Sequence, residues 1–161
     1  VPHKLRGACY NLLTMLDDND RPVGPIDCSG PLPAEALHGL ALFNAGEYFE
    51  AHEALENAWR AETGPVRELY RGILQVGVAY YHMLNGNYTG AVKMFQRCKP
   101  WLEPFPDGCK GIELDRFRED FLRVEAELLR LGPERLHLFN RRLLRRIHYR
   151  VDKSGEEKYH E

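Results

Sequence analysis

The sequence predicts an all-α protein: a single bundle of about six helices, with two stacked helical hairpins around a central buried helix and a C-terminal antiparallel pair. No segment alternates between apolar and polar residues as a strand does. Apolar residues recur instead every three or four positions, which is the spacing of one helix face. Short runs rich in Gly, Pro and Asn separate these stretches and mark turns. The 161 residues suit one domain, and a hydrophobic content of 43% is enough to bury a core.

The elements before the C-terminal pair are bounded by clear breaks. Residues 17–33 are dense in Pro, Gly and Asp, so we expect a loop there. Pro33 suits the first turn of the helix that follows, and Thr63-Gly64-Pro65 marks a later break. The helices expected in this part of the chain are 3–17, 33–45, 47–62, 66–84 and 88–101.

Two apolar stripes predict the C-terminal pair. A Gly132-Pro133 turn separates them, which favours two helices folded back on each other. A loop at 104–111 precedes the pair, and the polar tail 151–161 has little to bury and is expected to fray. The first stripe comprises Leu114, Phe117, Phe121, Val124, Leu128 and Leu131, and the second comprises Leu136, Phe139, Leu143 and Ile147.

A short internal repeat supports the two stacked hairpins. Residues 44–48 recur as 85–88, at the elbow of each expected hairpin. Tetratricopeptide repeats have another period and need about three copies, so a solenoid is not expected. Gly46, Tyr48, Ala51 and Leu55 correspond to Gly86, Tyr88, Ala91 and Phe95.

Polar residues gather where the helix 47–62 faces the helix 66–84. On the first helix, His52 and Glu56 fall on the inner face beside Trp59. On the second, which is apolar around most of its circumference, Gln75 needs a partner because a buried amide without one costs about 1–3 kcal/mol. We therefore predict a polar inter-helix pocket. Its expected residues are His52, Glu56, Trp59, Arg71, Gln75, Tyr81 and His82, with Tyr80 as an alternative wall to Tyr81.

Three interpretations of this pocket remain open. The polar residues can be a structural network, with Arg71 and Glu56 as an ion pair that fixes helix register, or they can hold a small anionic ligand through Arg71. His52 and Glu56, four residues apart, can also share a divalent transition metal, with Glu53 as a general base in a metal-assisted hydrolase. That alternative is not favoured, because a third ligand is required. Its candidates are His82, His38 and Glu53.

The chain also resembles a known family. The segments LFNAGEYFEAHEALENAWR and YRGILQVGVAYYHMLNGNYTGA are similar to the signature of domain-of-unknown-function family 309, from residue 37 to about 102. The resemblance implies a small, all-helical, cytosolic protein, as found in bacteria, archaea and plastids, and implies no established activity. The expected organisation is one domain, 1–161, with a family-like core at 34–102, a C-terminal helical hairpin at 111–150 and the polar tail at 151–161.

The charge and hydropathy of the chain limit the classes of partner that we expect. A net charge of −2 does not favour nucleic acid, and no apolar run approaches the roughly 18 residues that a membrane helix needs. We expect a non-catalytic binding or scaffold protein in the cytoplasm, with a small ligand, a protein partner or a second copy as partner. Docking of a protein partner would use exposed aromatic residues such as Phe49 or Trp101.

The cysteines and the arginines are expected to play no chemical part. No secretory signal is recognisable, so Cys9, Cys28, Cys98 and Cys109 are predicted to be free thiols, with Cys28 and Cys98 inert.

The arginines of the last helix are expected to pair with acidic residues of the preceding helix. The arginines are Arg141, Arg142, Arg145, Arg146 and Arg150, and the acidic residues are Glu119, Asp120, Glu125 and Glu127.

Overall fold

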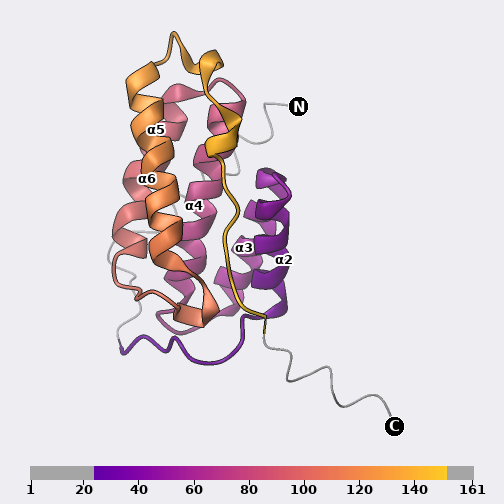
Figure 1. Cartoon of the computed structure of the whole chain (residues 1–161). Helices are drawn as coiled ribbons and strands as arrows, with labels where there is room; N and C mark the ends of the chain where they lie inside the picture. The colour runs from indigo at the N-terminus through magenta and orange to yellow at the C-terminus, as the bar shows by residue number, and fades with distance from the viewer. Residues whose placement is uncertain (1–23, 152–161) are drawn as a thin grey trace.

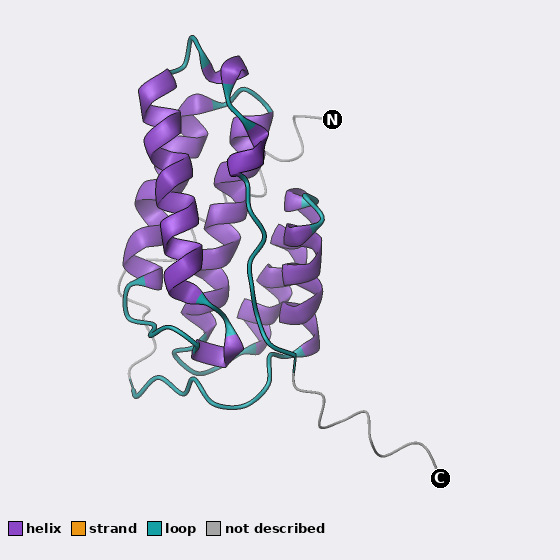
Figure 2. Cartoon of the chain, viewed as in Figure 1, coloured by secondary structure: helices purple, strands orange, loops and turns teal. Residues whose placement is uncertain are grey.

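The structure, a computed structural model, describes residues 24–151, and these residues are all-helical, as the sequence predicts (Figures 1 and 2). Within them there is no strand, and a single β-bridge joins Ile112 to Tyr149. The expected helix 3–17 and most of the expected tail lie outside the described residues. The five α-helices described are α2 (Ala34–Asn44), α3 (Tyr48–Ala61), α4 (Arg67–Leu84), α5 (Tyr88–Leu102) and α6 (Leu114–Leu131).

Two helical hairpins, α2–α3 and α4–α5, form the main part of the bundle. Their elbows have the same backbone conformation, with positive φ angles of 78° at Gly46 and 72° at Gly86, a region that glycine enters without steric cost. The backbone amide of Glu47 donates to Leu42 at 2.9 Å, and that of Asn87 donates to His82 at 2.8 Å. Equivalent glycines therefore reverse the chain at both ends of the internal repeat.

The long helix α4 is central, with α3 packed on one side and α5 on the other (Figure 1). Every residue from Glu68 to Tyr80 is buried. Close approach to α5 depends on Gly72, since a Cβ there would lie 2.5 Å from side-chain atoms of Leu102. Such burial on all sides explains why the sequence of this helix is apolar around most of its circumference.

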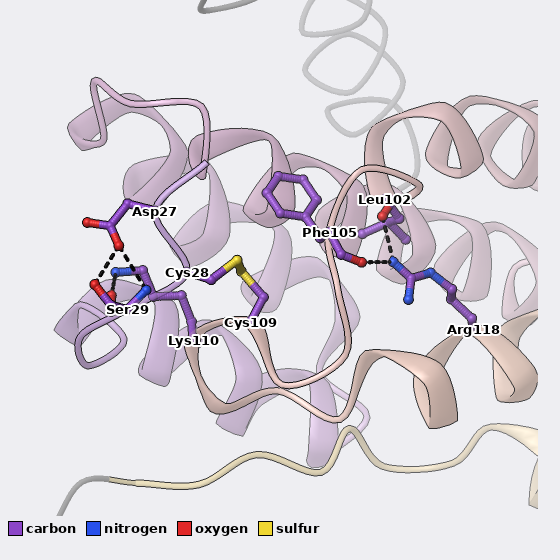
Figure 3. Close-up of a disulfide and its surroundings, with 8 residues drawn as sticks. All are labelled: Asp27, Cys28, Ser29, Leu102, Phe105, Cys109, Lys110 and Arg118. Atoms are coloured by element: carbon purple, nitrogen blue, oxygen red, sulfur yellow. Dashed lines mark hydrogen bonds between the residues drawn. A yellow bond between two sulfur atoms is a disulfide. The ribbon is translucent and has the colours of Figure 1, made fainter. Parts of the chain in front are cut away.

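Helix α6 covers the bundle through its apolar stripe, whose six residues are all buried. At the core, the ring of Phe117 contacts that of Phe43 edge-on, with centroids 6.0 Å apart. Arg118 turns toward the end of α5 and donates hydrogen bonds to the carbonyl oxygens of Leu102 at 2.7 Å and Phe105 at 2.5 Å (Figure 3). It thereby ties α6 to the end of α5 and to the loop that follows α5.

The predicted last helix, and with it the C-terminal helical hairpin 111–150, is wrong. After α6 the chain forms two 3-10 turns, Leu136–Leu138 and Arg141–Leu143, and then an extended segment (Figure 2). In a helix the amide of Ile147 would donate to Leu143, but it donates to the side chain of Asn44 instead, at 2.7 Å. A tertiary contact therefore replaces the local helical bond, although Leu136 and Ile147 of the predicted stripe are still buried.

Two of the cysteines contradict the prediction of free thiols. Cys28 and Cys109 form a disulfide between the loop before α2 and the loop before α6 (Figure 3). Lys110 strengthens this junction, donating from its amide to Cys28 O at 3.0 Å and from Nζ to Ser29 O at 2.5 Å. Cys98 is free, as expected, and its side chain is buried.

No helix within residues 24–151 is long and apolar enough to span a membrane.

Candidate functional site

Helices α3 and α4 run antiparallel, because only residues 62–66 connect them, and two ring contacts define their register. At one end, the rings of Phe49 and Tyr81 lie with centroids 6.2 Å apart. At the other end, the guanidinium of Arg67 lies 4.2 Å from the centre of the Trp59 ring, a cation–π contact. Gln75 lies on α4 between these two contacts, at the level of the middle of α3.

His52 is the most unusual polar residue of this seam. It is 3% exposed, and neither ring nitrogen has a hydrogen-bond partner. The nearest carboxylate oxygen, from Glu56, is 3.7 Å from Nε2, which is too long for a hydrogen bond. Burial lowers the pKa of His52 to about 4, so its ring is neutral at pH 7. A neutral imidazole offers one donor and one acceptor, and here both are unused.

Glu56 is only partly available to His52. Its other carboxylate oxygen pairs with the exposed guanidinium of Arg60, one turn further along α3. The side chain of Glu56 is 14% exposed, so the carboxylate lies at the rim of the seam. The ion pair with Arg71 that the sequence allowed is replaced by this local one, because Arg71 pairs elsewhere.

Buried polar atoms without partners concentrate on these two helices. Within residues 24–151 every such side-chain atom belongs to α3 or α4. Leaving one of them unsatisfied costs about 1–3 kcal/mol, so a group that pairs with them would be bound favourably. The atoms are His52 Nδ1, His52 Nε2, Trp59 Nε1, Arg67 Nε, Tyr70 Oη and Gln75 Oε1.

Two of the predicted pocket residues belong to other contacts. Arg71 lies 3.3 Å from the carboxylate of Glu68 and stacks over the ring of Trp101 on α5, 3.7 Å from its centre. His82, at the elbow of the second hairpin, has its Nδ1 3.2 Å from the side-chain nitrogen of Asn87. Eleven residues separate Arg71 from His82, about 16 Å along the helix. The predicted residues therefore spread along a seam that extends beyond any one small ligand.

The two metal ligands predicted from the sequence, His52 and Glu56, lie close together, with Nε2 of His52 3.7 Å from the Glu56 carboxylate. Within residues 24–151, no group of three or more His, Cys, Asp and Glu side chains could hold a metal ion. Of the third ligands considered, His38 and Glu53 are exposed. The metal site and its reaction stay a prediction without a complete ligand set in this part of the chain.

Phe49 belongs to the site, although sequence reasoning assigned it to partner docking. Its ring stacks on that of His52, with an interplanar angle of 19° and centroids 6.3 Å apart. Trp101, the other aromatic expected on the surface, is buried. The i, i+3 spacing of Phe49 and His52 was the available signal, since such residues are neighbours on a helix.

The arginines near the C-terminus pair less widely than expected. Arg145 lies 3.6 Å from the buried carboxylate of Asp120. Glu125 pairs with Lys99 and Glu127 with Arg130 instead, so both find partners outside the C-terminal arginines. The missing helix explains the difference, because its arginines do not line up beside α6.

Comparison with known proteins agrees with the resemblance seen in the sequence. Over 77 residues, 47% of this chain, the chain is 26% identical to an uncharacterised protein of Aquifex aeolicus (strain VF5). That stretch is 23% of the relative, so the chain spans about a quarter of the relative's length. Residues 36–94, which comprise α2, α3, α4 and the start of α5, match the model of a domain of unknown function, DUF309. The predicted resemblance to family 309 is thereby confirmed over these residues.

Proposed function

We propose that this chain is a non-catalytic binding protein whose α3–α4 seam takes a small, uncharged polar ligand at His52 and Gln75. The observation that carries the proposal is a buried, neutral imidazole with both nitrogens unpaired. The buried Oε1 of Gln75 adds an acceptor without a donor. A ligand with both donor and acceptor groups would satisfy these atoms and recover the free energy that their burial costs.

The charges around the seam favour a neutral ligand over the anion first considered. Arg71, the expected anion-binding residue, already lies beside Glu68. Glu56 likewise pairs with Arg60. A net charge placed at His52 would lose its hydration without an unpaired counter-charge nearby, which is costly in a buried site.

A thermal-shift screen with small neutral amides, ureas and polyols tests the proposal. We expect compounds that raise the Tm of the wild-type protein and of Gln96→Leu, but not of Gln75→Leu. Gln96 is a matched control, because it is an exposed glutamine on α5. Absence of any hit, or equal shifts in Gln75→Leu, would contradict the proposal.

Elemental analysis of protein purified without an affinity tag separates this function from the metal-dependent one. We expect no stoichiometric transition metal in the wild-type protein or in His52→Ala. A near-stoichiometric metal that disappears in His52→Ala would replace the binding proposal with metal-assisted hydrolysis.

A further inference from the structure

The extended segment 144–151, here called the strap, lies on the helices as a separate chain would. It leaves the last 3-10 turn and runs lengthwise along the bundle, ending beside the loop that precedes α6 (Figure 1). Of its residues only Ile147 is buried, and Leu144 and Tyr149 are half-buried. The strap is therefore attached through one deeply placed side chain and its backbone.

Its backbone is bonded along both edges. On one edge, the Asn44 side chain donates to Ile147 O at 2.9 Å and accepts from Ile147 N at 2.7 Å. On the other edge, Glu113 N donates to His148 O at 2.9 Å and Arg150 N donates to Gly111 O at 3.0 Å. All four bonds involve main-chain atoms of the strap, so they hold any extended peptide that can place its backbone there.

The surface below the strap is shaped for this approach. Gly111 has a φ of 79°, and a Cβ at this position would lie 3.2 Å from Arg150 O. A larger residue would therefore be strained at this φ and would crowd the strap backbone. A cavity of about 720 Å³ remains beside the strap, lined in part by Asn44, Asp107 and Glu113.

Charge adds a second level of selection. The strap carries Arg145, Arg146, His148 and Arg150. Opposite them, Asp120 is buried with Arg145 at 3.6 Å, and the Glu113 carboxylate lies 4.0 Å from His148. The surface that contacts the strap, formed by Asn44, Gly111, Glu113 and Asp120 and here called the groove, thus favours a basic peptide with one aliphatic anchor.

We propose that this groove docks an extended, basic partner peptide with an aliphatic residue at the position of Ile147, and that the strap occupies it as an intramolecular ligand. Asn44 lies within residues 36–94, which match the family model, whereas the strap lies outside them. The family-matching region therefore contributes a main-chain clamp that this chain fills with its own segment. A partner binds when it displaces the strap, as in the addition of a strand to an exposed edge.

Peptide binding to the full chain tests the proposal. The probe is a fluorescein-labelled peptide of residues 141–151, RRLLRRIHYRV, with a scrambled peptide of the same composition as its charge-matched control. Ile147→Asp in the protein removes the anchor of the strap and leaves the groove intact. We expect this variant to bind the peptide roughly tenfold or more tightly than the wild type, because its groove is free for a larger fraction of the time.

Three further comparisons make the test decisive. Adding Asn44→Ala to Ile147→Asp should abolish the gain, and the scrambled peptide should bind neither protein. Equal binding of both peptides, or no gain in Ile147→Asp, would overturn the proposal. A wild-type dimer that Ile147→Asp abolishes would also overturn it, since the groove would then take the strap of a second copy.

A surface variant covers the case in which Ile147→Asp does not fold. Arg145 is about half exposed, and Arg145→Glu places a second carboxylate beside Asp120. We expect this variant to fold, to exchange the amide protons of Glu113 and Arg150 faster than the wild type, and to gain affinity for the peptide. Faster exchange without a gain in affinity would overturn the proposal.

Discussion

Cys28 and Cys109 form a disulfide that closes a loop of 81 residues, which contains helices α2 to α5. The bond joins the segment before α2 to the loop before α6. The side chain of Cys109 is buried. A long cross-linked loop restricts the unfolded chain far more than the folded one. The prediction of free thiols followed from the cytoplasmic location expected from the sequence, and it is wrong for this pair.

Loss of this disulfide should destabilise the protein by about 2–4 kcal/mol. We expect Cys28→Ser and wild-type protein in excess reductant to show the same lower Tm. Cys98→Ser is the control for reductant, because Cys98 is free. Thiol labelling of denatured, unreduced protein should modify Cys98 and leave Cys28 and Cys109 unmodified. Labelling of all three would show that the bond is absent under those conditions.

Stability should rise with pH between about 4 and 6.5 because of His52. Burial lowers the pKa of His52 from 6.5 to about 4, so in this range the unfolded chain binds a proton that the folded chain does not. The free energy of unfolding therefore increases with pH across this window and is independent of His52 above it. The full difference is about 3 kcal/mol.

Urea unfolding between pH 5 and 7 measures this effect, since most carboxylates stay ionised there. We expect a smaller slope in His52→Gln than in the wild type. His137→Gln, at an exposed histidine outside the strap, is the control, and it should retain the wild-type slope. Identical slopes in all three proteins would contradict a buried neutral imidazole.

Two glycines within α4 should respond oppositely to alanine. A Cβ at Gly72 would overlap Leu102, which is buried and cannot move aside, so Gly72→Ala should cost about 1–3 kcal/mol. A Cβ at Gly77 would meet only the Phe43 ring at 3.4 Å, an ordinary contact. Gly77→Ala should be neutral or stabilising by up to about 1 kcal/mol, because alanine favours a helix. Chemical denaturation of both variants gives the comparison, and equal effects would refute the packing argument.

Arg118 should contribute more to stability than its neighbour Arg116. Arg118→Ala removes hydrogen bonds to Leu102 O and Phe105 O and leaves both carbonyl groups without this donor, which should cost about 1.5–3 kcal/mol. Arg116 makes only an exposed contact of 3.8 Å with Glu113, so Arg116→Ala should change stability by less than about 1 kcal/mol. Thermal unfolding of the two variants measures both losses of stability. Equal losses in Arg118→Ala and Arg116→Ala would mean that the two hydrogen bonds of Arg118 contribute nothing beyond its charge.

Local pattern was sufficient for the helices from α2 to α6. Their ends follow the Gly and Pro breaks that the sequence predicts, and the stripe of α6 is buried as its spacing indicates. The same reasoning failed after Gly132, since an apolar residue every three or four positions also suits 3-10 turns and an extended segment with widely spaced anchors. His52 and Gln75 were predicted to be inward-facing from helix geometry alone, and both are buried.

The sequence by itself determined the all-helical class, the two glycine elbows and the inward position of His52, because each depends on residues within one or two turns. Only the tertiary structure decided that Asn44 clamps Ile147, that Cys28 joins Cys109 and that Arg71 turns to Trp101. These pairs join residues from 30 to 103 positions apart. No local preference encodes such contacts, since they form only when packing of the helices brings distant loops and helix ends together.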